Sequence, residues 1–63
     1  MKLNDCIKLI KADGWLELKR KGTSHRHFKH SVKQGKVTIP DHGKNINLPK
    51  GTFNSILKQA GLK

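Results

Sequence analysis

The apolar residues of this 63-residue chain form two stripes of helical spacing, one near each end, separated by three short alternating segments. The first stripe is Leu3, Cys6, Ile7 and Ile10, and the second is Phe53, Ile56, Leu57 and Ala60. Spacings of three and four residues place side chains on one face of a helix, whereas alternation is typical of a strand. The pattern therefore predicts the element order helix, strand, strand, strand, helix.

Polar and glycine residues mark the ends of the two predicted helices. The first helix is predicted over residues 3–13, with Asn4 as its N-cap and Gly14 just beyond its end. The second helix is predicted within residues 48–62, where it ends at Gly61. Pro49 near its start agrees with the preference for proline in the first helical turn.

Three segments are predicted to be strands: "WLELKR" (15–20), "HRHFKH" (25–30) and "KVTIP" (36–40). Their short connections favour an antiparallel meander. Two amphipathic helices must bury their stripes, and packing both on one face of the sheet leaves the other face open. Residues 1–63 are therefore predicted to be one α+β domain, a three-stranded antiparallel sheet with two helices on one face.

Successive side chains of a strand point to opposite faces, so residues 25–30 divide into two sets. One set is His25, His27 and Lys29, and the other is Arg26, Phe28 and His30. Phe28 is the only strongly apolar residue of the segment, so its side is expected to meet the helices. The same alternation separates Trp15 from Leu16, and we expect Trp15 to pack beside the first helix, with stacking on an RNA base as the alternative.

The charge of the chain is strongly one-sided. Fourteen lysines and arginines against four acidic residues give a net charge of +10. Such an excess attracts polyanions, and nucleic acid is the expected partner ahead of an anionic membrane or an acidic protein. The predicted helices are short and not unusually basic, which disfavours a membrane-surface role. No stretch approaches the roughly 20 apolar residues that cross a bilayer.

The single cysteine bears on the expected location of the protein. Cys6 cannot form an internal disulfide, and a lone thiol suits a reducing compartment such as the cytosol. Because it belongs to the first apolar stripe, we interpret it as a buried hydrophobe and not as a nucleophile. No signal peptide is visible after Met1, so a cytoplasmic protein is expected.

The histidine-rich segment "GTSHRHFKH" (22–30) has three competing interpretations. A metal site would use His25 and His27 together with His42, but it lacks the cysteines and carboxylates that complete a zinc site. A solvated basic strand requires no function at all. In the catalytic interpretation, a histidine accepts the proton of a ribose 2′-hydroxyl while basic side chains stabilise the charge at phosphorus, with no metal or cofactor. The residues alone leave the last two open.

Four segments, taken in this order, resemble the HicA family of toxin ribonucleases. They are "DGW" (13–15), "GTSHRHF" (22–28), "VTIPDHG" (37–43) and "LPKGTFNSILKQAGL" (48–62). The resemblance extends from Leu3 to Leu62 and implies a double-stranded-RNA-binding-like α-β-β-β-α fold. It also implies the toxic half of a toxin–antitoxin pair, which cleaves mRNA until a HicB antitoxin covers its active surface.

The resemblance also implies a role for individual residues. The catalytic histidine of the family follows the turn that opens the second strand, which corresponds to His25. Relatives more often have Gly-Ser-His, one residue shorter than the sequence here, so His27 is the alternative. His42 matches a Pro-x-His-Gly element and is interpreted as structural or RNA-contacting. The candidate RNA contacts are Lys19, Arg20, Lys21, Ser24, Arg26, His27 and Lys29.

An alternative function belongs to a different class. A non-catalytic RNA-binding module of the double-stranded-RNA-binding type would carry the same charge and the same expected fold. Such a module would lose affinity gradually as its lysines were removed, with no special dependence on His25. A basic subunit that acts only when bound to an acidic partner is a third possibility, and it overlaps with the toxin interpretation.

Overall fold

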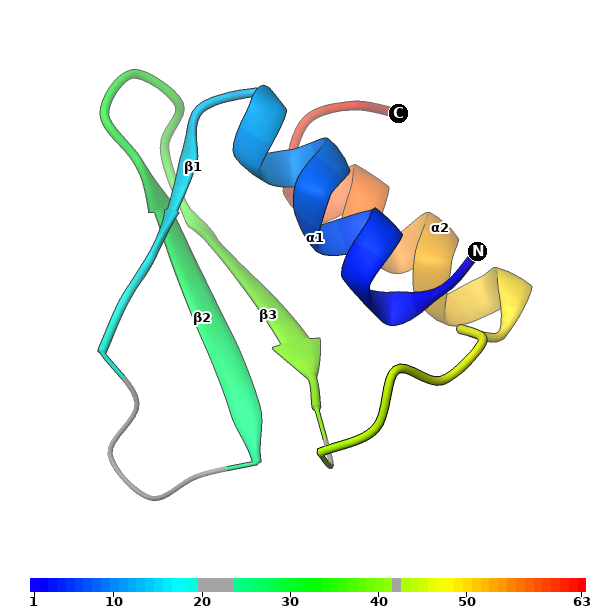
Figure 1. The fold of residues 1–63 in the computed structure, drawn as a ribbon. Coiled ribbons are helices and arrows are strands. Elements are labelled where there is room, and N and C mark those ends of the chain that lie inside the picture. The colour runs from blue at the N-terminus through cyan, green and yellow to red at the C-terminus, as the bar shows by residue number, and fades with distance from the viewer. Residues whose placement is uncertain (20–23, 42) are drawn as a thin grey trace.

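A computed structural model of the chain describes residues 1–19, 24–41 and 43–63. The elements are α1 (Leu3–Ala12), β1 (Trp15–Glu17), β2 (His25–His30), β3 (Lys36–Pro40) and α2 (Lys50–Gln59). The strands form one antiparallel sheet in the order β1-β2-β3, and both helices lie on the same side of it (Figure 1). The predicted α+β architecture is confirmed. None of the helices in the described part of the chain is long and apolar enough to span a membrane.

The hydrophobic core lies between the sheet and the two helices, with α1 packed against β1 and α2 against β3. Its members are Leu3, Cys6, Ile7, Ile10, Trp15, Phe28, Val37, Ile39, Leu48, Ile56 and Ala60. Trp15 is only 1% exposed, so it is a core residue as predicted and not a base-stacking one. Burial raises the pKa of the Cys6 thiol, which agrees with its interpretation as a small core residue.

The start of α1 differs from the prediction. Lys2 and not Asn4 occupies the N-cap position, and no side-chain hydrogen bond is made from it. Instead, the backbone N–H of Asn4 donates to Oδ1 of Asn45 at 2.9 Å, and that of Leu3 donates to the carbonyl of Ile46 at 2.8 Å. The segment before α2 therefore satisfies donors that a local cap usually satisfies.

The glycines predicted to follow the helices do so. Gly14, with φ +104°, follows the C-cap residue of α1, and Gly61, with φ +70°, follows that of α2. At the end of α2, the N–H of Gly61 donates to the carbonyl of Lys58 and that of Leu62 to the carbonyl of Leu57. This pair of bonds is a Schellman motif, which requires a residue of positive φ that glycine adopts without strain.

The first strand is shorter than predicted, whereas the other two have the predicted bounds. β1 ends at Glu17, although the N–H of Leu18 still donates to the carbonyl of His27 at 2.8 Å. The strand predicted over 15–20 is therefore wrong at Leu18 and Lys19, and Arg20 lies outside the described residues. β2 pairs with β3 from His25 opposite Pro40 to Lys29 opposite Lys36.

Candidate functional site

The open face of the sheet carries one column of side chains on each strand. β2 contributes His25, His27 and Lys29, the set that strand alternation predicts for this face. The cross-strand partners of these residues share the face with them. On one side of β2 these are Leu16 and Leu18, and on the other side they are Lys36, Thr38 and Pro40.

His25 is the first residue of β2 and is exposed. Its backbone lies opposite Pro40, the last residue of β3. Just outside this pair, the N–H of Asp41 donates to the carbonyl of Ser24 at 2.8 Å. The hydrogen-bonded ladder therefore fixes the backbone around His25 at the exposed start of the strand.

His27 lies next along the same column and is half-buried. Its Nδ1 is 3.1 Å from the hydroxyl oxygen of Thr38, the residue opposite it on β3. This contact orients the imidazole over the sheet, between His25 and Lys29. The column therefore presents two imidazoles followed by an ammonium group, all on one side of one strand.

Arg26 points to the opposite side of β2, where carboxylates surround its guanidinium. Its Nε donates to Oε2 of Glu17 at 2.8 Å, its Nη2 donates to the other oxygen of Glu17, and its Nη1 donates to Oδ2 of Asp41 at 3.2 Å. The hydrogen bond with Glu17 is the main cause that raises the pKa of Arg26. The side chain is 16% exposed. The predicted RNA contact by Arg26 is therefore not supported, because its donors bind two carboxylates within the fold.

His30 has a structural role that its position at the strand end only partly predicts. Its Nδ1 accepts hydrogen bonds from the backbone N–H groups of Val32 and Lys33, at 3.0 and 3.1 Å. Because Nδ1 accepts, Nε2 carries the proton and donates to the carbonyl of Asp13 at 2.7 Å. The ring also meets Trp15 edge-on, with centroids 5.2 Å apart. His30 therefore joins the end of α1 to the turn between β2 and β3.

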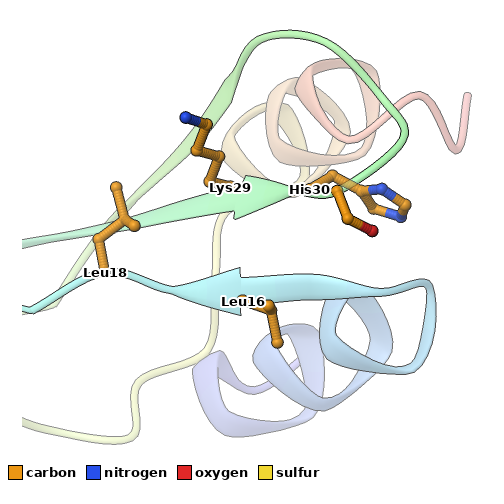
Figure 2. Close-up of a pocket in the computed structure, with 5 residues that line it drawn as sticks. Leu16, Leu18, Lys29 and His30 are labelled. Atoms are coloured by element: carbon orange, nitrogen blue, oxygen red, sulfur yellow. The ribbon is translucent and has the colours of Figure 1, made fainter.

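An apolar groove lies on the open face along β1 and β2. It is lined by Leu16, Leu18, Lys29, His30 and Ser31 (Figure 2). We did not predict this groove or the position of Lys36 beside Lys29. A signal for the groove was present in the sequence, since a buried Trp15 requires the next residue of the strand to point outward.

Some of the predicted site residues lie outside the described part of the chain. These are Arg20, Lys21 and His42. Of the other predicted RNA contacts, Lys19, Ser24 and Lys29 are exposed. Within the described residues, no group of three or more histidine, cysteine or acidic side chains could hold a metal ion.

The sequence of this chain matches the model of one known protein family. The family model described as the HicA toxin of bacterial toxin–antitoxin systems matches residues 3–62. The chain belongs to the HicA toxin family. This match includes all five helices and strands, from the first residue of α1 to the last residue of the Schellman motif that ends α2. A HicA toxin is one component of a toxin–antitoxin system, so an antitoxin is its partner. A search of curated proteins found no match.

Proposed function

We propose that this HicA toxin is an endoribonuclease that cleaves mRNA in the cytoplasm, with His25 as general base or acid, and that a HicB-type antitoxin restrains it. The observation that carries the proposal is the exposure of His25 at the start of β2, in one column with His27 and Lys29. Histidine transfers protons near neutral pH, and the neighbouring cations favour a phosphodiester as the group on which it acts.

The distribution of acidic residues supports a polyanionic substrate. The chain has only four acids, and Glu17 and Asp41 both bind Arg26 on the helix side of β2. Asp13 binds Lys33, and Asp5 lies in the first turn of α1. None of the four carboxylates belongs to the columns of the open sheet face. The exposed lysines of these columns, Lys29 and Lys36, carry positive charge that attracts phosphates.

The proposed reaction needs no group beyond the chain and its RNA substrate. His25 accepts the proton of a ribose 2′-hydroxyl, and the 2′-oxygen forms a bond to the adjacent phosphorus. The bond between phosphorus and the 5′-oxygen breaks, and that oxygen takes a proton from water or from His27. The products are a 2′,3′-cyclic phosphate and a 5′-hydroxyl. Lys29 and Lys19 stabilise the negative charge of the phosphate groups of the bound strand.

The competing function is a non-catalytic RNA-binding module. It uses the same basic face, so affinity for RNA alone does not separate the two proposals. Dependence on a single imidazole does separate them, because loss of one general base lowers a rate by about 10²–10⁴-fold, whereas loss of one phosphate contact weakens binding gradually.

The test is incubation of the purified protein with end-labelled mRNA in EDTA, beside His25→Ala and His27→Ala variants whose folding is checked by circular dichroism. We expect cleavage by the parent, a loss of about 10²–10⁴-fold in rate for His25→Ala, and a smaller loss for His27→Ala. If all three proteins bind the RNA equally and none cuts it, the binding module replaces the nuclease. If His27→Ala shows the larger loss, the catalytic role passes to His27.

A further inference from the structure

The groove on the open face has an apolar side, formed by residues of β1 and the residue after it, and a polar side formed by β2. The β1 side is apolar, with Leu16 67% exposed and Leu18 37% exposed. The adjacent β2 column consists of His25, His27 and Lys29, and neighbouring strands are about 4.8 Å apart. A ligand that fits both columns has a flat apolar part and an anionic part separated by a few ångströms.

Two lysines beside the groove indicate that its ligand is an anion. Lys29 and Lys36 lie directly opposite each other on β2 and β3, and both are exposed. Directly opposed like charges destabilise an antiparallel pair. A phosphate between the two ammonium groups removes that repulsion and gains two charge-assisted hydrogen bonds. Leu16, Lys29 and Lys36 form one row across the sheet, so the anion lies beside the apolar part of the groove.

We propose that this groove is a subsite for an unpaired nucleobase of RNA. The base lies on Leu16 and Leu18, and its phosphate binds Lys29 and Lys36. Burial of these two exposed leucine side chains against the base supplies apolar affinity without a specific base edge. The proposal rests on the proposed nuclease function, since it names the form in which that RNA is bound.

The subsite lies beside the scissile position and not at it. His25 and Lys29 are four residues apart on one strand, which corresponds to about 13 Å. A single RNA strand that follows β2 reaches both residues, with His27 between them. The nucleotide in the groove is therefore a neighbour of the cleaved bond and contributes to affinity and position.

The chemistry of the groove distinguishes single-stranded from double-stranded RNA. In a duplex the faces of the bases are stacked and only their edges and the backbone are accessible. A groove lined by leucines offers little to a duplex, whereas an unpaired base can place its face against it. The proposal therefore predicts that this toxin prefers unpaired RNA despite the resemblance of its fold to duplex-binding domains.

The test measures RNA binding in a His25→Ala background, in which the strand stays intact. The probe is a short unstructured oligoribonucleotide with an end label, and a second set of probes carries one abasic nucleotide at each position in turn. Leu16→Asn is the test variant, because a side chain that is 67% exposed can be replaced without disturbing the core. Leu9→Asn on α1, at a side chain 40% exposed, is the matched control.

We expect Leu16→Asn to weaken binding of the unstructured probe about tenfold and Leu9→Asn to have little effect. For the His25→Ala protein, an abasic nucleotide at one position of the probe should weaken binding by a similar factor. For the protein that also carries Leu16→Asn, the same abasic probe should cause no further loss of affinity. A duplex of the same sequence should bind both proteins equally. The subsite is overturned if Leu16→Asn leaves binding unchanged while the parent still cuts RNA in a His25-dependent manner. It is also overturned if Leu16→Asn weakens only binding of the antitoxin. Absence of any cleavage by the parent contradicts the nuclease function itself.

Discussion

Arg26 on β2 donates from two nitrogens to both carboxylate oxygens of Glu17, the last residue of β1. The same guanidinium donates to Asp41, so one side chain joins β1 and β2 to the residue that follows β3. A bidentate pair of this kind is stronger than a neutral hydrogen bond and fixes geometry as well. Arg26 is therefore a structural cation of β2, whereas Lys29 on the opposite face of the same strand is exposed.

Replacement of Arg26 should affect the stability of the fold, whereas replacement of Lys29 should affect the binding of RNA. Arg26→Met removes the hydrogen bonds of the guanidinium to Glu17 and Asp41 and should lower the free energy of unfolding by about 2 kcal/mol, measured in urea. Lys29→Met should leave stability nearly unchanged but reduce the salt dependence of RNA binding by about one unit of slope. A reduced salt slope in Arg26→Met would instead show that Arg26 contacts phosphate.

The pair of Asp13 and Lys33 makes the stability of the fold sensitive to acid. Lys33 Nζ donates to Asp13 at 2.5 Å and to the carbonyl of Ala60 at 3.1 Å, which joins the ends of both helices to the turn between β2 and β3. The hydrogen bond from Lys33 is the main cause that lowers the pKa of Asp13. Since the folded pKa is lowered, the stabilisation is present above the unfolded pKa of about 3.9 and is lost as the pH falls through the folded value.

Asp13→Asn should therefore lower the melting temperature at neutral pH, and the difference from the parent should shrink as the pH falls below about 4. The same substitution in a Lys33→Met background should have a much smaller effect, because the partner is already absent. A difference that persisted unchanged at low pH would show that Asp13 acts through backbone geometry and not through its charge.

His30 should exist as the neutral tautomer with the proton on Nε2. The two backbone donors at Nδ1 and the carbonyl acceptor at Nε2 leave no other assignment that satisfies all three contacts. Nitrogen chemical shifts of the ring in the folded protein report this tautomer directly. His30→Phe keeps a ring beside Trp15 but loses the three hydrogen bonds, and we expect it to lower the free energy of unfolding by about 1–3 kcal/mol.

Gly14 and Gly51 offer a matched pair of glycine replacements. A Cβ at Gly14 would lie 2.6 Å from Nε2 of His30, and the φ of +104° is unfavourable for any other residue. Gly14→Ala should therefore cost roughly 1–3 kcal/mol of stability. A Cβ at Gly51, within α2, meets nothing within 4 Å, so Gly51→Ala should raise stability slightly. Equal effects at the two positions in thermal unfolding would contradict this account.

Lys29 and Lys36, which lie opposite each other, should lower the stability of the sheet but strengthen the binding of RNA. Lys36→Gln removes the repulsion with Lys29 and should raise the free energy of unfolding by about 0.5 kcal/mol at low salt, with a smaller gain at high salt. The same variant should bind the unstructured oligoribonucleotide more weakly. Lys44→Gln, in the exposed segment before α2, is the control and should change neither quantity appreciably. A stability gain equal to that of Lys44→Gln would indicate that Lys29 and Lys36 do not interact.

Much of the site was predictable from the alternation of a single strand. Because successive side chains of β2 point to opposite faces, one buried phenylalanine, Phe28, assigns His25 and His27 to the open face. The first helical stripe likewise predicts the core residues of α1. The second stripe is only partly correct, because Ile56 and Ala60 are buried whereas Leu57 is half-buried and lies outside the core. What local patterns missed are contacts between segments far apart in the sequence, such as Asn45 at the start of α1 and Glu17 beside Arg26.

The sequence by itself determined the order of the elements, the face of each side chain and the excess of positive charge, because these depend on local periodicity and composition. Only the tertiary structure decided which residues stand opposite one another. The register of β2 against its neighbours places Lys29 between Leu16 and Lys36. It also places Arg26 within hydrogen-bonding distance of the carboxylates of Glu17 and Asp41. Register is set by the burial of one whole face against both helices, which is a property of the assembled sheet and not of any one segment.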